Sequence, residues 1–163
     1  MKNINQKLLK EELTYSPETG IFIRNKSSGG KLAGCNAGGI HSEGYIYISL
    51  RGKRYFAHRL AWLYMTGENP SQLIDHINGN RSDNRFENLR LATKSQNGRN
   101  AKVRKDSTSG IKGVRFERNL NKWTASIFHG KKRIHLGVFE SSDLAYQARE
   151  SAAKRLHGDF YHA

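Results

Sequence analysis

Cysteine and long hydrophobic runs are both scarce in this chain of 163 residues. Cys35 is the only cysteine, so no intramolecular disulfide can form, and one thiol cannot build a cysteine-rich zinc knuckle by itself. The longest apolar stretch, Ala61–Met65, is far too short to span a bilayer, and residues 1–13 lack the apolar core of a signal peptide. The sequence therefore predicts a soluble, cytoplasmic protein with no membrane partner, working in a reducing compartment.

Acidic residues are also few relative to basic ones. Lys and Arg number 28 against 14 Asp and Glu, which gives a formal net charge of +14. This excess favours a polyanionic partner, because basic side chains bind phosphates and release condensed counterions. Nucleic acid is the leading candidate, since an anionic membrane would require a basic amphipathic helix or a lipidation signal, and neither is found. A merely solvated basic surface is the other interpretation, and charge alone does not separate DNA from RNA.

The patterning indicates two small units rather than one large domain. A hydrophobic content of 36% is thin for one large core. The segment Arg104–Gly110 is polar, rich in Ser and Thr and free of large apolar residues, which is typical of a linker. We therefore divide the chain into residues 1–103, the linker 104–110 and residues 111–163.

The first unit is predicted to mix short strands and helices. Helical patterns cover Asn3–Leu13 and His58–Gly67. A strand is predicted at Ile21–Arg24, and alternating residues on either side of Arg51–Lys53 predict a hairpin. The glycine-rich segment Ser27–Gly39 lacks the Gly-Lys-Ser/Thr ending of a phosphate-binding loop, so we expect it to be a flexible connection.

The second unit is predicted to contain three strands followed by one helix. Alternating polar and apolar residues predict strands over Lys112–Arg118, Lys122–Phe128 and Lys132–Phe139, and an alanine stripe predicts a helix from about Ser141 to Gly158. The helix can cover the apolar sheet face, which comprises Val114, Phe116, Trp123, Ala125, Ile127, Ile134 and Leu136. The other face is polar, basic and partly aromatic. We favour DNA binding there over a plain solvated face, because a small sheet can enter the major groove.

The segment Leu73–Asn97 carries many polar side chains for a stretch bounded by apolar residues. Asp75 can hold a divalent cation, His76 can take a proton from water near neutral pH, and several amides can fasten a loop by bonding its backbone. Together these are the parts of metal-assisted hydrolysis. Asp-His is also a common dipeptide, and Asn-Gly with further Asn residues usually forms a turn, so these fragments alone favour a turn over catalysis.

The order and spacing of the whole segment resemble the HNH endonucleases, in particular the group found among phage-encoded and intron-associated homing enzymes. The matching residues are DHINGN, DNRFENLR and Asn97, preceded by HRLAWLYMTGENP, and the resemblance covers Tyr45–Asn100. It implies a ββα site in which a strand, an ordered loop, a second strand and a helix surround one metal ion. It also implies cleavage of DNA to 5′-phosphate and 3′-hydroxyl ends.

The resemblance implies a role for four residues of the motif. Asp75 and Asn97 would be metal ligands, His76 would be the general base, and Asn88 would tie down the loop that orients His76. Many relatives have a histidine in place of Asn97, but an amide oxygen still ligates a hard cation. We therefore expect Mg²⁺, with Mn²⁺ as the alternative, and no small-molecule cofactor.

Four further polar residues near the motif are given no catalytic role. His58 and Arg59 could reach a phosphate, although an arginine at a helix start is more often a surface or packing residue. Asn84 and Arg85 are expected to serve the loop or the DNA backbone.

The segment Ser109–Gly158 resembles the AP2 DNA-binding domain. The landmarks are Gly113-Val114-Arg115, Trp123, Leu136-Gly137, Phe139 and the alanine-rich helix. The resemblance implies that a three-stranded antiparallel sheet packed on one helix enters the major groove of duplex DNA. The positions that match its DNA contacts are Arg115, Arg118, Ser126, Phe128, Arg133 and His135. Three of these depart from the residues usual in plant members, so the target sequence does not transfer: Ser126, Phe128 and His135.

These observations predict an α+β protein, with a ββα-metal HNH nuclease domain that has an N-terminal sheet extension, followed by a small AP2-like domain. The expected function is metal-dependent hydrolysis of phosphodiester bonds in duplex DNA, as a nick or a double-strand cut, with site choice aided by the AP2-like domain. The alternatives are a DNA-binding regulator with a vestigial nuclease fold and an RNA-binding protein. The oligomeric state is open, with a monomer favoured, and the resemblance implies an infected bacterial host.

Overall fold

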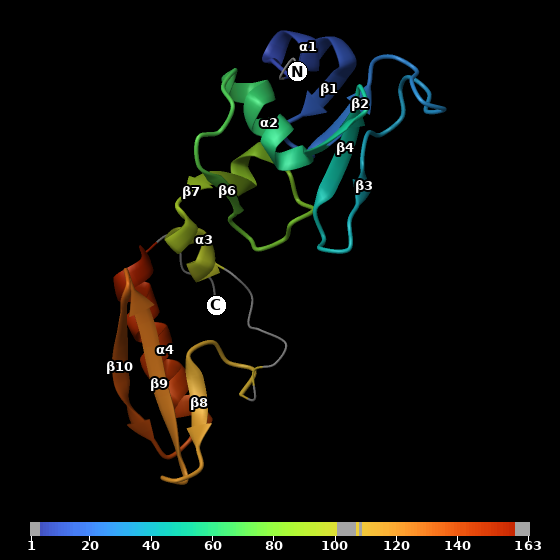
Figure 1. The fold of residues 1–163 in the computed structure, drawn as a ribbon. Helices are drawn as coiled ribbons and strands as arrows, with labels where there is room; N and C mark the ends of the chain where they lie inside the picture. Colours follow the sequence, from blue (N-terminus) through green and yellow to red (C-terminus); the bar gives the residue numbers. More distant parts are fainter. Residues whose placement is uncertain (1–3, 101–106, 108, 159–163) are drawn as a thin grey trace. The chain divides into compact units, whose positions relative to one another are not determined.

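The chain forms two compact units, Met1–Lys94 and Ser95–Ala163 (Figure 1). The computed structural model describes residues 4–100, 107 and 109–158. The division falls before the predicted linker 104–110, most of which lies outside the described residues. Both units mix helices and strands, which confirms the α+β class. Within the described ranges, no helix is long and apolar enough to cross a membrane.

The first unit is built from short antiparallel sheets and two α-helices. Its elements are α1 (Gln6–Glu12), β1 (Leu13–Ser16), β2 (Ile21–Arg24), β3 (Gly39–Ile40), β4 (Ile46–Leu50), β5 (Lys53–Phe56), α2 (Ala57–Thr66), β6 (Leu73–His76), a 3-10 helix (Phe86–Asn88) and β7 (Leu89–Ala92). The sheets have the strand orders β1-β2, β3-β4-β5 and β6-β7. The predicted strand β2, hairpin β4/β5 and helix α2 are confirmed. The helix α1 stops at Glu12 because Leu13 already pairs with Arg24 in the β1/β2 hairpin.

The core of the first unit lies between α1, α2 and the strands β1, β2 and β4. Its largest fully buried apolar side chains are Phe22, Leu9, Leu13, Ile48, Leu60 and Leu63. The Tyr15 ring lies 4.6 Å from the Phe22 ring between centroids, and both rings meet Tyr64 edge-on. This packing aims the Tyr15 hydroxyl at the loop between β6 and β7, where it donates to the carbonyl oxygen of Asn84 (2.7 Å).

The glycine-rich segment Ser27–Gly39 is held against the end of β2. The N–H of Arg24 donates to the carbonyl of Cys35 (3.0 Å), and the Arg24 carbonyl accepts from the N–H of Gly34 (2.8 Å). The expectation of a flexible connection is therefore wrong for the second half of the segment. Its small side chains let the backbone run beside β2 and use the edge hydrogen bonds of that strand.

The second unit is a three-stranded antiparallel sheet covered on one face by a helix (Figure 1). Its elements are α3 (Lys94–Asn100), which starts at the division between the units, β8 (Val114–Glu117), β9 (Lys122–His129), β10 (Lys132–Phe139) and α4 (Ser142–His157), and its strand order is β10-β9-β8. The hydroxyl of Ser141 accepts from the N–H of Leu144 at the start of α4, and Gly158 caps its end. The predicted three strands and following helix are confirmed.

The apolar face of this sheet is only partly covered. Val114, Ala125 and Ile127 are buried in clusters with the alanines of α4. Phe116 and Ile134, however, are 41% and 37% exposed. Assigning these two residues to the core was wrong: α4 buries Val114 on the outer strand β8 but leaves Phe116 of that strand and Ile134 of β10 exposed, because the short alanine side chains of its packing stripe cover only part of the sheet.

The turn before β2 packs against the loop between β6 and β7. Gly20 has a φ of +73°, and a Cβ built on it would lie 2.5 Å from both the carbonyl carbon of Asn84 and the backbone nitrogen of Arg85. Nearby, the N–H of Phe86 donates to the carbonyl of Pro17 (3.0 Å). Glycine at position 20 therefore lets two backbone segments come into direct contact.

We expect Gly20→Ala to lower the free energy of unfolding more than Gly29→Ala does. Both glycines have a positive φ, so either alanine costs about 1–2 kcal/mol in backbone strain. Nothing lies within 4 Å of a Cβ at Gly29, so the further loss in Gly20→Ala, on the order of 1–3 kcal/mol, reports the backbone contact alone. Chemical denaturation of the full chain measures both losses, and equal losses would contradict the contact.

Candidate active site

The strands β6 and β7 hold the first two motif residues on a rigid hairpin. The pair is antiparallel, with Asp75 opposite Arg90 and His76 opposite Leu89. Asp75 and His76 are each only 4% exposed. Both polar groups are therefore positioned by a strand rather than by a mobile loop, and each depends on polar contacts to offset its burial.

Asn88 fastens the loop that joins the two strands. Its side-chain oxygen accepts from the N–H of Asn78 (2.9 Å), and its amide nitrogen donates to the carbonyl of Asp83 (2.8 Å) and to Asn78 Oδ1 (3.1 Å). Its backbone carbonyl also accepts from the N–H of Ile77 (2.8 Å). One buried amide thus bonds both halves of the loop, which is the geometry that the role implied for Asn88 requires.

Asp83 stabilises the same loop through its charge. Its carboxylate accepts from Arg85 in an ion pair (2.8 Å) and from the side chain of Asn78 (2.7 Å). Hydrogen bonding from Arg85 is the main cause that lowers the pKa of Asp83 to about 2. Arg85, which was expected to serve either the loop or the DNA backbone, therefore bonds within the loop.

Asn84 orients the imidazole of His76. Asn84 is 1% exposed, and its Oδ1 lies 3.2 Å from His76 Nε2. The amide nitrogen of Asn84 donates to the carbonyl of Ser82 (3.2 Å), so its oxygen must be the atom that faces the ring. Nε2 of His76 then carries the proton, and the neutral ring bears its lone pair on Nδ1. The sequence did not reveal this contact, although Asn84 stood among the amides of the motif.

A second histidine, His58, packs against His76. The two ring centroids are 5.1 Å apart and the rings are nearly perpendicular, at 83°. Burial, with smaller contributions from His76 and Arg59, lowers the pKa of His58 to about 3. Burial also lowers the pKa of His76, although the hydrogen bond with Asn84 acts in the opposite direction. Both imidazoles are therefore neutral at neutral pH.

Arg90 is the partner of Asp75 that sequence reasoning missed. Its Nε and Nη2 donate to the same carboxylate oxygen of Asp75, at 2.9 and 2.8 Å. The pair follows from strand register, which sets the two residues opposite each other, and register could not be derived from the motif alone. Arg59, by contrast, donates to the carbonyl of Pro70 (3.0 Å) and so anchors the chain before β6.

The donor chemistry of the predicted metal ligands fits a hard divalent cation. Asp75 contributes a buried carboxylate, and Asn97, which lies half-buried on α3 in the second unit, contributes an amide oxygen. Oxygen donors suit Mg²⁺ and Mn²⁺ better than Zn²⁺. Among the residues that the structure describes, no three His, Cys, Asp or Glu side chains gather to form a metal site. The pairing of Asp75 with Asn97 stays a prediction.

Most of the residues implied as DNA contacts share one face of the β8–β10 sheet. Strand register sets Arg133 opposite Phe128 and His135 opposite Ser126, with Arg115 on the adjacent strand β8. Phe128 is 61% exposed, whereas Ser126 is buried and its hydroxyl accepts from Arg133 Nε (3.0 Å). Ser126 thus holds an arginine in place. Arg118, the remaining residue implied as a DNA contact, lies exposed in the turn after β8.

The sequence is similar to a family model over the motif and to known proteins over a longer part of the chain. The family model of HNH endonucleases matches residues 55–99, which include Asp75, His76, Asn88 and Asn97. Protein 3.8 of Escherichia phage T7 is 33% identical over 110 residues, covering 63% of this chain and 85% of that protein. The chain belongs to the HNH endonuclease family.

Two further similarities extend over part of this HNH endonuclease. The solved structure titled "DNA binding and cleavage by the HNH homing endonuclease I-HmuI" matches with a TM-score of 0.47 and 28% identity, covering 61% of this chain and 57% of that one. The dehydration-responsive element-binding protein 1E of Oryza sativa subsp. indica is 28% identical over 102 residues, covering 61% of this chain and 46% of that protein. The present chain therefore covers about half the length of each of these two proteins.

Acid should destabilise this HNH endonuclease through His58. The folded-state pKa of about 3 lies below the ordinary value of 6.5, so the unfolded chain binds more protons between these values. The free energy of unfolding should then fall as the pH drops below 6.5, by up to about 1.4 kcal/mol per pH unit. His58→Phe keeps an aromatic ring and should flatten this slope in urea denaturation series. The control His129→Phe, at an exposed histidine, should leave it unchanged, and equal slopes in all three proteins would contradict this assignment.

Proposed function

We propose that this protein is a divalent-metal-dependent endonuclease that hydrolyses phosphodiester bonds in duplex DNA, with the second unit gripping the DNA and aiding the choice of site. The observation that carries the proposal is the buried imidazole of His76, oriented by Asn84 on a loop that Asn88 fastens. A neutral ring held in one orientation is what general-base catalysis requires. Membership of the HNH family supports the reaction class.

His76 is the proposed general base. Its Nε2–H donates to Asn84, so Nδ1 accepts a proton from water, and the resulting hydroxide attacks the phosphorus atom. The bond between phosphorus and the 3′ oxygen breaks, and the departing oxygen takes a proton from solvent. The products are a 5′-phosphate and a 3′-hydroxyl. Because burial lowers the pKa of His76, the ring is ready to accept the proton at neutral pH.

Asp75 and Asn97 are the proposed ligands of one divalent cation, Mg²⁺ or Mn²⁺. When bound, such a cation stabilises negative charge on the cleaved phosphate and on the departing oxygen. Arg90 donates twice to Oδ2 of Asp75 and so sets the orientation of the carboxylate. The buried charge of Asp75 is thereby offset within the protein.

The second unit is proposed to bind DNA in the manner of an AP2 domain. Three features support this: the exposed ring of Phe128, the arginine that Ser126 holds beside it, and Arg115 on the neighbouring strand. An arginine on a sheet face can donate two hydrogen bonds to guanine in the major groove, and an aromatic side chain adds apolar contact. The rice relative, named as an element-binding protein, supports the same assignment.

Replacing His76 tests the chemical step. We expect His76→Ala to reduce Mg²⁺-dependent cleavage of duplex DNA at least about 100-fold, because the proposed general base is removed, while DNA affinity stays close to that of the wild type. Gel assays of cleavage and fluorescence anisotropy in EDTA measure the two properties. The control His129→Ala removes an exposed imidazole outside the motif and should cleave normally. Parallel loss of binding and cleavage in His76→Ala would contradict the role, and a wild type that binds without cleaving would favour a regulator.

Two arginines of the sheet test the proposed grip on DNA. Arg115→Ala with Arg133→Ala should weaken binding and flatten the dependence of log K on log salt by about 0.9 for each phosphate that the variant no longer neutralises. The matched control is Lys154→Ala with Arg155→Ala, which removes the same charge from exposed positions of α4. Binding titrations at several salt concentrations compare the two. An unchanged slope of log K against log salt in the Arg115/Arg133 variant would exclude direct binding of phosphates by these two arginines. An equal change of slope in the control variant would exclude it as well.

A further inference from the structure

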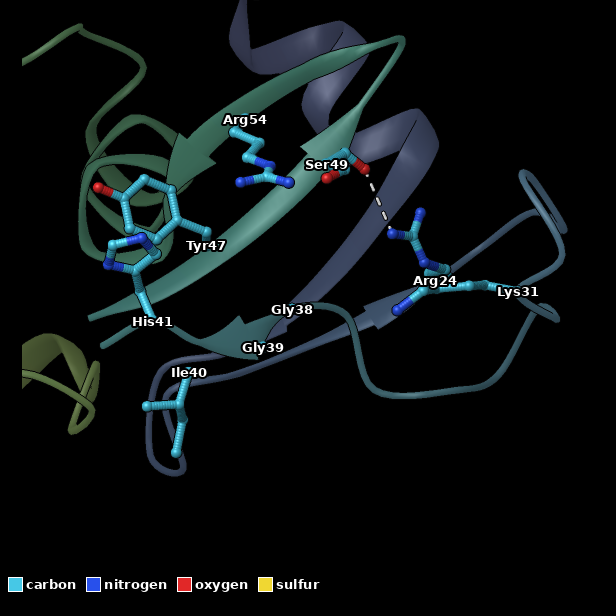
Figure 2. A pocket seen from close by; sticks show the side chains of 9 residues that line it. All are labelled: Arg24, Lys31, Gly38, Gly39, Ile40, His41, Tyr47, Ser49 and Arg54. Carbon is cyan, nitrogen blue, oxygen red and sulfur yellow. Dashed lines mark hydrogen bonds between the residues drawn. The ribbon is translucent and has the colours of Figure 1, made fainter. Parts of the chain in front are cut away.

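A basic hollow lies in the first unit, outside the HNH motif. It has a volume of about 240 Å³ and is bounded by the end of β2, the glycine-rich segment and the strands β3, β4 and β5. Figure 2 shows that three cationic side chains line it from separate parts of the chain, Arg24 from β2, Lys31 from the glycine-rich segment and Arg54 from β5. The function proposed above uses none of them.

Arg24 is the group in this hollow that most needs a partner. It is 7% exposed, its Nη2 donates to the carbonyl of Ser49 (3.2 Å), and its buried Nε has no hydrogen-bond partner in the structure. No ion pair between described residues includes Arg24. A buried cation with an unsatisfied donor is costly unless an anion compensates it.

The remainder of the lining adds positive charge and no negative charge. Lys31 and Arg54 are exposed, and the lining contains no Asp or Glu. Arg51 on the same hairpin is different, because it forms an ion pair with Glu12 (2.9 Å). The fold therefore neutralises an arginine at one end of the hairpin and leaves the cations of the hollow without a carboxylate among the described residues.

The glycine-rich segment lets the backbone close this side of the hollow. Gly38 has a φ of +111°, and a Cβ there would lie 2.7 Å from the side chain of Ile46. Gly39 also lines the hollow, and nothing lies within 4 Å of a Cβ built there. The segment has no phosphate-loop ending in its sequence, yet the fold places its lysine and two arginines around the same hollow (Figure 2).

We propose that this hollow binds a phosphate group through Arg24, Lys31 and Arg54. Guanidinium groups form paired hydrogen bonds with phosphate oxygens, and the ammonium group supplies a further charge. The volume lies below the range of about 300–1,000 Å³ for sites that take drug-sized ligands, which suits one phosphate. The phosphate comes either from the DNA backbone away from the cleaved bond, a source that rests on the function proposed above, or from a free phosphate or nucleotide.

The first measurement is a titration of the full chain with inorganic phosphate in the presence of EDTA. The amide NMR signals of Gly39 and His41 report the binding. The pocket variant is Lys31→Gln with Arg54→Gln, which leaves the buried Arg24 and the fold in place. The control is Lys7→Gln with Lys53→Gln, two exposed lysines of the same unit that do not line the hollow. We expect saturable shifts in the wild type and the control, and at least tenfold weaker binding in the pocket variant. Absence of saturable shifts, or equal affinity in all three proteins, would overturn the proposal.

The second measurement separates the two sources of phosphate. Duplex DNA is titrated in EDTA at several salt concentrations. If the hollow takes a backbone phosphate, the slope of log K against log salt concentration should be smaller by about 0.9 in the pocket variant than in the control. The affinity of the pocket variant for DNA should then be roughly eightfold weaker than that of the control at about 0.1 M salt. Weaker phosphate binding with unchanged DNA binding would assign the hollow to free phosphate or a nucleotide. Neither titration requires cleavage, so failure of the His76 assignment would leave both results interpretable.

Discussion

The hydrogen bond between Asn84 and His76 is the contact on which the rest of the motif depends. Asn84 meets the imidazole with its side chain, while its backbone carbonyl accepts from the hydroxyl of Tyr15 and its backbone lies against Gly20. The orientation of the proposed base is thus set by a hairpin near the start of the chain. The N-terminal hairpin β1/β2 therefore supports the loop of the HNH motif, through Tyr15, Pro17 and Gly20.

Burial and charge are balanced differently around the motif and around the basic hollow of the first unit. Around the motif, Arg90 offsets the buried carboxylate of Asp75, and Arg85 offsets Asp83. Burial lowers the pKa of both His58 and His76, so the two imidazoles stay neutral. In the hollow near β2, Arg24 has no such acid among the described residues. The first arrangement suits proton transfer, and the second suits the capture of an anion.

The proposed activity assigns different tasks to separate elements. A β-hairpin carries the base, a three-stranded sheet presents arginines and an aromatic ring, and a glycine-rich segment closes a cationic hollow. A duplex offers a phosphate every few ångströms along its length, so one substrate can engage several such surfaces at once. On these proposals, part of the net charge of +14 serves to bind phosphates at separate sites.

Local periodicity and capping residues are enough to predict several elements, such as the β4/β5 hairpin, the helix α2 ending at Gly67, and α4 between Ser141 and Gly158. The sequence also supplied the motif residues through their spacing. Other features emerge only in the folded chain: Arg90 faces Asp75, His58 packs on His76, and Phe116 and Ile134 stay exposed. These outcomes follow from strand register and from packing between residues far apart along the chain, and neither leaves a periodic signal in the sequence.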